Sequence, residues 1–112
     1  MIFGSPDIAA KMGSDFTPVR ALDICGVARN LKAGGPPLNG LRHPPTETSS
    51  GWFIWAGPEL GQAHDYFQPL CAEHLREECP AVLPYLGLAP GWRFLVAPGH
   101  EDVWFDANLL NV

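Results

Sequence analysis

The clearest structural signal in the chain is the stretch Gly91-Trp92-Arg93-Phe94-Leu95-Val96-Ala97-Pro98-Gly99-His100-Glu101-Asp102-Val103-Trp104-Phe105-Asp106. Residues 91–97 and 102–106 are rich in aromatic and β-branched side chains, which favour strands. Pro98-Gly99 favours a tight turn between them, because proline fixes its own φ and glycine accepts a positive φ. The stretch therefore predicts an antiparallel hairpin whose second strand is acidic and aromatic.

A second glycine-tryptophan pair opens another strand, Gly51-Trp52-Phe53-Ile54-Trp55. Side chains alternate between the two faces of a strand, so Trp52 and Ile54 are expected on one face and Phe53 and Trp55 on the other. Large apolar groups on both faces have two interpretations. Either the strand is central in a sheet that is covered on both sides, or it presents an aromatic face to a partner.

Weaker patterns complete the fold prediction. Residues 22–29 and 39–43 are expected to be strands, with a glycine- and proline-rich turn at 33–37 between them. A proline at the first position and apolar spacing predict a helix over 69–78, and a short helical turn is expected over 81–86. The sequence thus predicts an α+β fold: one antiparallel sheet of about four or five strands, with the main helix and the turn on one face. The predicted core comprises Ile24, Val27, Trp52, Ile54, Leu70, Leu75, Leu83, Leu86, Trp92, Phe94, Val96, Val103 and Phe105.

The first 20 residues mix glycine and proline with one short apolar stretch. We expect residues 1–20 to be a loosely packed arm, with a single helical turn after Asp7 as its N-cap. Residues 21–112 are expected to form one domain, since a chain of 112 residues is too short for two. Hydrophobic residues make up 46% and charged residues 17%, which is typical of a globular protein.

The charge of the chain is unevenly distributed. Its formal net charge is −5; residues 1–50 carry five basic and four acidic side chains, whereas residues 51–112 carry two basic and eight acidic ones. An acidic field repels nucleic acid, whose binding proteins usually present a basic face, and it favours a basic protein partner. The simpler interpretation is that the acidic surface only keeps the protein soluble.

Nothing in the sequence indicates a membrane or secretory protein. No apolar run approaches the roughly 20 residues of a membrane helix, and the first residues lack the pattern of a signal peptide. Cys25, Cys71 and Cys79 are an odd number without the spacing of a disulfide framework. We therefore expect a cytoplasmic protein with reduced thiols.

The residues that could carry chemistry do not form a recognisable catalytic pattern. Cys71 and His74 share a face of the predicted helix, and Cys79 follows it, but zinc needs a fourth ligand. No local signature pairs Cys25 with one of the histidines at positions 43, 64, 74 and 100. Glu77, Glu78, Glu101, Asp102 and Asp106 suit a solvated surface better than paired acid and base groups. We expect no catalytic residue, no metal and no cofactor.

The tryptophans are the best candidates for a binding surface, because tryptophan is enriched at the centres of protein interfaces. Four tryptophans in so short a chain make it plausible that one is surface-directed, and Trp55 and Trp104 are the candidates. Together with the acidic residues of the last strand, they give one predicted protein-binding set: Trp55, Glu101, Asp102, Trp104 and Asp106.

The pattern of residues 22–112 resembles a known family. Cys25-Gly26-Val27-Ala28-Arg29, the pair Ser50-Gly51-Trp52 with Ala56-Gly57, and the closing acidic-aromatic strand are similar to the bacterial immunity protein thirty-three-like domain. That resemblance implies a compact α+β domain, without a catalytic motif, that neutralises a toxin by binding it. It also implies that the gene for the toxin lies beside the gene for this protein.

Three functions follow as hypotheses. The first is a non-enzymatic binding protein whose acidic and aromatic surface contacts a basic toxin, with neither nucleic acid nor a membrane as partner. The second is a small enzyme or ligand-binding protein with a pocket between sheet and helix, and with Tyr66, Cys71 and His74 near its mouth. The third is a self-associating protein.

Overall fold

The computed structural model describes residues 1–31, 35–57 and 66–111. Its helical elements are the α-helices α1 (Pro6–Met12) and α2 (Leu75–Glu78) and the 3₁₀ helices η1 (Ala72–His74), η2 (Pro80–Gly87) and η3 (Ala107–Leu110). Its strands are β1 (Ile2–Phe3), β2 (Val19–Arg20), β3 (Ile24–Ala28), β4 (Leu38–Arg42), β5 (Trp52–Ala56), β6 (Phe67–Cys71), β7 (Trp92–Ala97) and β8 (His100–Phe105).

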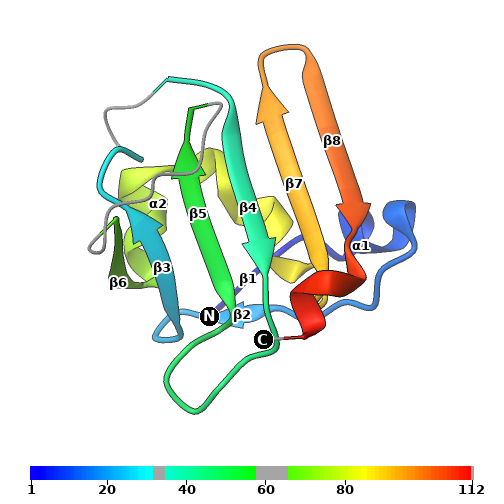
Figure 1. Ribbon diagram of the computed structural model, residues 1–112, viewed down its shortest axis with the longest axis horizontal. Helices are drawn as coiled ribbons and strands as arrows, with labels where there is room; N and C mark the ends of the chain where they lie inside the picture. Colours follow the sequence, from blue (N-terminus) through cyan, green and yellow to red (C-terminus); the bar gives the residue numbers. More distant parts are fainter. Residues whose placement is uncertain (32–34, 58–65, 112) are drawn as a thin grey trace.

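The main sheet has six strands in the order β6-β3-β5-β4-β7-β8, and β1 pairs with β2 in a separate two-stranded sheet (Figure 1). The α+β class is confirmed, but the sheet is larger than predicted and is mixed. β5 lies between β3 and β4, and it runs parallel to β3 and antiparallel to β4. The chain therefore crosses over from β3 to the far side of β5, forms β4, and returns, which makes β3 and β5 parallel neighbours.

The predicted helix over 69–78 is wrong in its first three residues. Residues 67–71 form β6, which pairs with β3 in antiparallel register, and only η1 and the four-residue α2 follow. Pro69 suits the first position of a helix, where its missing N–H has no cost. Proline is also tolerated in an edge strand, and β6 is an edge strand whose Leu70 pairs with Cys25.

The predicted hairpin is confirmed. β7 and β8 pair from Trp92–Phe105 to Ala97–His100, so Pro98 and Gly99 form the turn. Gly99 has a φ of 74°, as a glycine in this turn requires. Of the predicted turn at 33–37, residues 33 and 34 lie outside the described residues.

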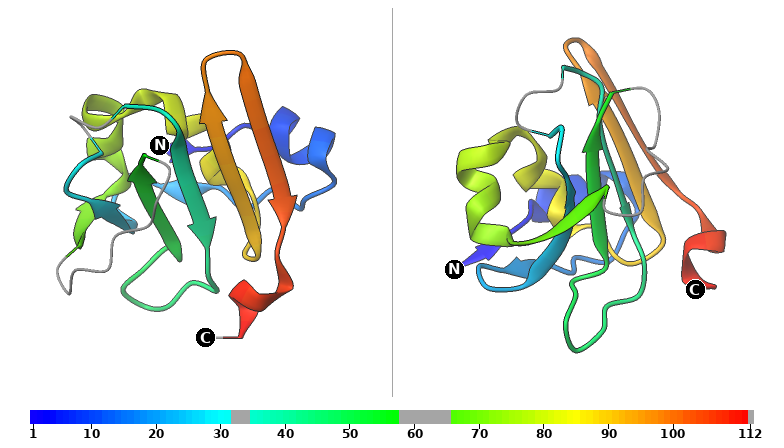
Figure 2. Two further views of the ribbon diagram at one scale, coloured as in Figure 1. Left: turned by 45° about the horizontal axis from the view of Figure 1, so that its top comes forward. Right: turned by 60° about the vertical axis from the view of Figure 1, so that its left-hand side comes forward.

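The helices α1, α2 and η2 lie on one face of the sheet, and η3 lies beside the other (Figures 1 and 2). We call the two sides the helix-covered face and the open face. Residues 1–20 pack on the helix-covered side: the Ser5 N–H donates to the Pro84 carbonyl over 2.9 Å, and the Thr17 N–H to the Gly87 carbonyl over 2.7 Å. Phe3 and Val19 are buried in the core. The expected loose packing of this arm therefore does not describe these residues.

Helix α1 begins earlier than predicted. Ser5, not Asp7, is its N-cap, and the Ser5 side chain accepts a hydrogen bond from the Ile8 N–H. The helix then starts at Pro6, where the missing N–H of proline has no cost.

The core lies between the sheet and the helices. Trp52, Ile54, Leu75, Leu86 and Phe94 are fully buried there, as predicted. Two predicted core residues lie elsewhere. Ile24 is half-buried on the open face, since β3 directs its neighbours Cys25 and Val27 inward. Phe105 is 49% exposed, because β8 is an edge strand with a neighbour on one side only.

No helix within the described part of the chain is long and apolar enough to cross a membrane.

Candidate protein-binding surface

Strand β8 carries Trp104, an exposed aromatic residue of the predicted protein-binding set. The register places Trp104 opposite Arg93 and Asp102 opposite Leu95. Since Phe94 and Val96 of β7 face the core, these four side chains point to the open face of the sheet. Trp104 is 39% exposed, and Asp102 is also exposed, with His100 Nε2 3.0 Å from its carboxylate.

Arg93 fixes the Trp104 ring against the sheet. Its guanidinium carbon lies 5.2 Å from the centroid of the Trp104 ring, the distance of a cation–π contact. The same guanidinium donates to Asp106 Oδ2 over 3.4 Å, while Asp106 Oδ1 accepts from the Asn108 N–H and caps η3. Asp106 is thus occupied by contacts within the protein, and Trp104 is held in one orientation with part of its ring exposed to solvent.

Glu101 points to the helix-covered face, away from Asp102 and Trp104. It accepts a hydrogen bond from the Tyr85 hydroxyl of η2, and Lys11 Nζ of α1 lies 3.5 Å from its other oxygen. The Tyr85 hydrogen bond lowers the pKa of Glu101. In turn, burial together with the Glu101 carboxylate raises the pKa of Tyr85 to about 12. Glu101 therefore joins the hairpin to both helices.

Trp55 does not lie with the other predicted site residues. It is 5% exposed, in the middle of the sheet, with its ring edge against Phe67 of β6 at a centroid distance of 6.3 Å. Phe53, Phe67 and His43 continue this aromatic packing over the open face of β5. A buried Trp55 offers no contact area to a partner.

The structure therefore brings Asp102 and Trp104 together as an exposed pair and separates them from Glu101 and Trp55. Phe105 is a further exposed aromatic residue on β8, which sequence reasoning assigned to the core. One signal in the sequence could have identified Phe105 as exposed. It lies in the last strand of the chain, after which no further strand follows to pair with the outer edge of the hairpin, and an edge strand has a neighbour on one side only. Phe105 pairs with Trp92 and points, like Glu101, away from the open face, so we use the name β8 surface for Asp102 and Trp104 alone.

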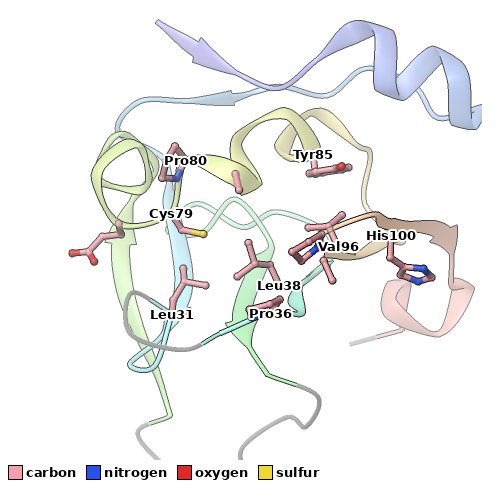
Figure 3. A pocket seen from close by; sticks show the side chains of 12 residues that line it. Leu31, Pro36, Leu38, Cys79, Pro80, Tyr85, Val96 and His100 are labelled. Carbon is pink, nitrogen blue, oxygen red and sulfur yellow. The ribbon is translucent and has the colours of Figure 1, made fainter.

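A cavity of about 600 Å³ lies between the sheet and η2 (Figure 3). Its lining is mainly apolar and includes Leu31, Leu38, Val96 and Tyr85, with Cys79 and His100 at its sides. Tyr66, Cys71 and His74, which were expected at the mouth of such a pocket, do not line it. That expectation rested on a helix that begins at residue 69, whereas residues 69–71 belong to strand β6 and only residues 72–78 are helical.

The cysteines and histidines do not form a metal-binding cluster in the described part of the chain. Within residues 1–31, 35–57 and 66–111, no three His, Cys, Asp or Glu side chains are grouped as metal ligands. Cys25 is buried with its Sγ 3.3 Å from the Ser50 hydroxyl, and burial raises the pKa of its thiol. His43 contacts the Leu109 carbonyl instead, at 2.9 Å from Nδ1. His64 lies outside the described residues.

A family model, the Imm33-like domain, matches residues 5–106. The chain belongs to the Imm33-like domain family. The match starts well before residue 22, the first residue of the pattern described above, and this agrees with the contacts that Ser5 and Thr17 make with η2. No curated protein and no solved structure matches this Imm33-like domain.

Proposed function

We propose that this Imm33-like domain is a non-enzymatic immunity protein that neutralises a toxin by binding it through the β8 surface. The observation that carries the proposal is the position of Trp104, which is partly exposed, fixed by Arg93 and next to the exposed carboxylate of Asp102. A pre-oriented aromatic side chain loses little conformational entropy on binding, and such residues supply much of the affinity of protein interfaces.

Charge favours a basic partner. The half of the chain that contains β8 carries eight acidic and two basic side chains. Complementary charge accelerates encounter and disfavours incorrect partners more than it adds affinity. The acidic residues then select the toxin, while burial of the Trp104 ring holds it.

The experiment uses the purified chain and the purified product of the adjacent gene. Calorimetry and size-exclusion chromatography should show a complex of defined stoichiometry, and the toxin should lose its activity as the complex forms. Raising the salt concentration should weaken binding, because exposed charges are screened. If neither a complex nor a loss of toxin activity is seen at micromolar concentrations, the proposal is wrong.

The cavity supports a second candidate function, binding of a small apolar molecule. Its volume of about 600 Å³ lies within the range of roughly 300–1,000 Å³ that is usual for ligand pockets. A hydrophobic fluorophore added to the protein should gain fluorescence, and Leu38→Trp, which fills the cavity, should remove that gain. Equal fluorescence of both proteins would exclude the cavity as the binding site.

A further inference from the structure

The six-stranded sheet has two outer edges, β6 at one end and β8 at the other (Figure 1). An edge strand leaves every second residue with its backbone N–H and C=O directed away from the sheet, and these groups can pair with another chain. Which residues face outward follows from the hydrogen bonds that each edge strand makes with its inner neighbour.

The edge at β6 is closed by a proline. The Ala72 N–H donates to the Asp23 carbonyl over 2.8 Å, and the Arg29 N–H donates to the Tyr66 carbonyl over 3.3 Å. Because hydrogen-bonded and non-hydrogen-bonded pairs alternate, Pro69 belongs to a non-hydrogen-bonded pair with Gly26, and its backbone nitrogen faces outward. This nitrogen carries no hydrogen, so the central outward donor of β6 is absent.

The edge at β8 has no such block. The Asp106 N–H donates to the Gly91 carbonyl over 2.7 Å, which fixes the alternation along the hairpin. Asp102 and Trp104 therefore direct their backbone groups to β7, whereas Glu101, Val103 and Phe105 direct theirs outward. Each of these three residues has an N–H, and within the described part of the chain no strand pairs with this edge.

We propose that the outer edge of β8 binds an extended segment of the partner protein as an added antiparallel strand. The inference rests on the proposed function and specifies how the β8 surface would be used. Strand addition of this kind obtains affinity from main-chain hydrogen bonds and specificity from alternate side chains. Antiparallel addition matches the pairing of β7 with β8 that already continues the sheet.

The side chains of β8 define the chemistry of that segment. On the outer edge Asp102 occupies a non-hydrogen-bonded position, where the facing side chains approach most closely, so lysine or arginine is expected opposite it. Two residues along the added strand, an apolar or aromatic side chain would cover the exposed part of Trp104. A second copy of this chain is disfavoured, because it would bring two acidic halves together.

The test compares two proline substitutions in the complex with the product of the adjacent gene. Val103→Pro removes the central outward donor of β8, as Pro69 does naturally in β6. Cys71→Pro is the matched control: Cys71 also faces outward, from the closed edge, and its φ of −63° already suits proline. Val103→Pro should weaken binding at least about tenfold, whereas Cys71→Pro should leave the affinity unchanged.

The affinities of the unaltered chain and of Val103→Pro distinguish strand addition from the proposed function. If the unaltered chain binds and a folded Val103→Pro variant binds equally well, strand addition is wrong and the proposed function stands. If the unaltered chain does not bind at all, both are wrong. If the chain alone dimerises and Val103→Pro makes it monomeric, the occupant of the edge is a second copy and the proposal is overturned.

Amide hydrogen exchange tests the same point without a variant, should Val103→Pro fail to fold. In the free protein the amides of Glu101, Val103 and Phe105 should exchange rapidly, while those of Asp102 and Trp104 are protected by β7. In the complex, protection should appear at the first three. Unchanged exchange at these three amides in a formed complex would contradict strand addition.

Discussion

The guanidinium of Arg42 and the indole of Trp52 converge on one backbone carbonyl in the core. Trp52 Nε1 donates to the Leu86 oxygen over 3.1 Å, Arg42 Nη1 donates to the same oxygen over 3.3 Å, and the guanidinium carbon lies 5.6 Å from the Trp52 ring centroid. Arg42 is 3% exposed and also donates to the carbonyls of Thr17, Ser50 and Leu88. One buried cation thereby joins the sheet to η2 and to the N-terminal segment.

Replacing Arg42 should therefore destabilise the fold strongly. Arg42→Met leaves several buried carbonyl groups without donors, and we expect a loss of about 3 kcal/mol in the free energy of unfolding. Arg20→Met is the matched control, because Arg20 forms an exposed ion pair with Asp23 and should change stability by less than about 1 kcal/mol. Urea unfolding measures both. Equal losses for the two variants would show that the buried contacts do not stabilise the fold.

The close approach of Phe94 to Gly40 gives a second prediction. A Cβ atom at Gly40 would lie 2.2 Å from a ring carbon of Phe94, and that ring is stacked on Tyr85 at a centroid distance of 4.9 Å. Gly40→Ala should cost about 1–3 kcal/mol, as other overpacked cores do. Gly35→Ala, where no atom of the described residues lies within 4 Å of the added carbon, should be nearly neutral in the same unfolding experiment. A neutral Gly40→Ala would contradict this packing.

The hydrogen bond between Tyr85 and Glu101 predicts a pH dependence of stability. Burial, and then the Glu101 carboxylate, raises the pKa of Tyr85 to about 12 from a reference value of 10.0. The stabilisation of the fold by the neutral Tyr85 hydroxyl is therefore complete below pH 10 and is lost as the pH rises towards 12. The pKa of Glu101 is lowered, chiefly by Tyr85, so its contribution is present at neutral pH and is lost in acid.

Thermal unfolding of the unaltered protein and of Tyr85→Phe measures this contribution. The difference in Tm between the two proteins should be largest from neutral pH to pH 10. It should shrink in acid, where Glu101 is protonated, and as the pH approaches 12, where Tyr85 ionises. A difference that stays constant from acid to pH 12 would show that the two side chains are not coupled.

The three thiols should differ in reactivity. Cys25 and Cys79 are buried, and burial raises the pKa of each thiol, whereas Cys71 is only half-buried. A thiol-alkylating reagent at neutral pH should therefore modify Cys71 first and Cys25 only after unfolding. Peptide mass spectrometry identifies the modified residue. Early modification of Cys25 in the native protein would contradict the described core.

Local patterns in the sequence were sufficient to predict the hairpin and the alternation of β5, because glycine, proline and tryptophan determine turns and strand faces within a few residues. They were not sufficient for β6, since a proline followed by apolar residues suits both a helix start and an edge strand. Pairing of β3 with β5 depends on contacts between distant residues. The burial of Arg42 has no local signal at all, because its acceptors are backbone carbonyls of three other segments.

The candidate site was predictable only in part, because local patterns show the character of one strand but not its contacts with distant segments. The acidic and aromatic character of β8 is visible in the sequence, and it identified Trp104 and Asp102. Strand alternation would have separated Glu101 from these two residues, but the contacts that hold Glu101 come from η2 and α1, and only the fold shows them. Trp55 could not be assigned as buried, because its cover includes Phe67 of β6, a strand that the sequence did not predict.

The measurement that tests the central claim most directly is the Kd of the complex with the product of the adjacent gene for two pairs of variants. Trp104→Ala should cost at least about 2 kcal/mol, or roughly 30-fold in Kd, while Leu22→Ala, which removes an exposed apolar side chain elsewhere, should have no effect. Asp102→Lys should weaken binding more than Glu77→Lys, which makes the same change of charge on α2. Loss of affinity confined to the β8 variants is the predicted result; equal affinities for all four variants would contradict binding through the β8 surface.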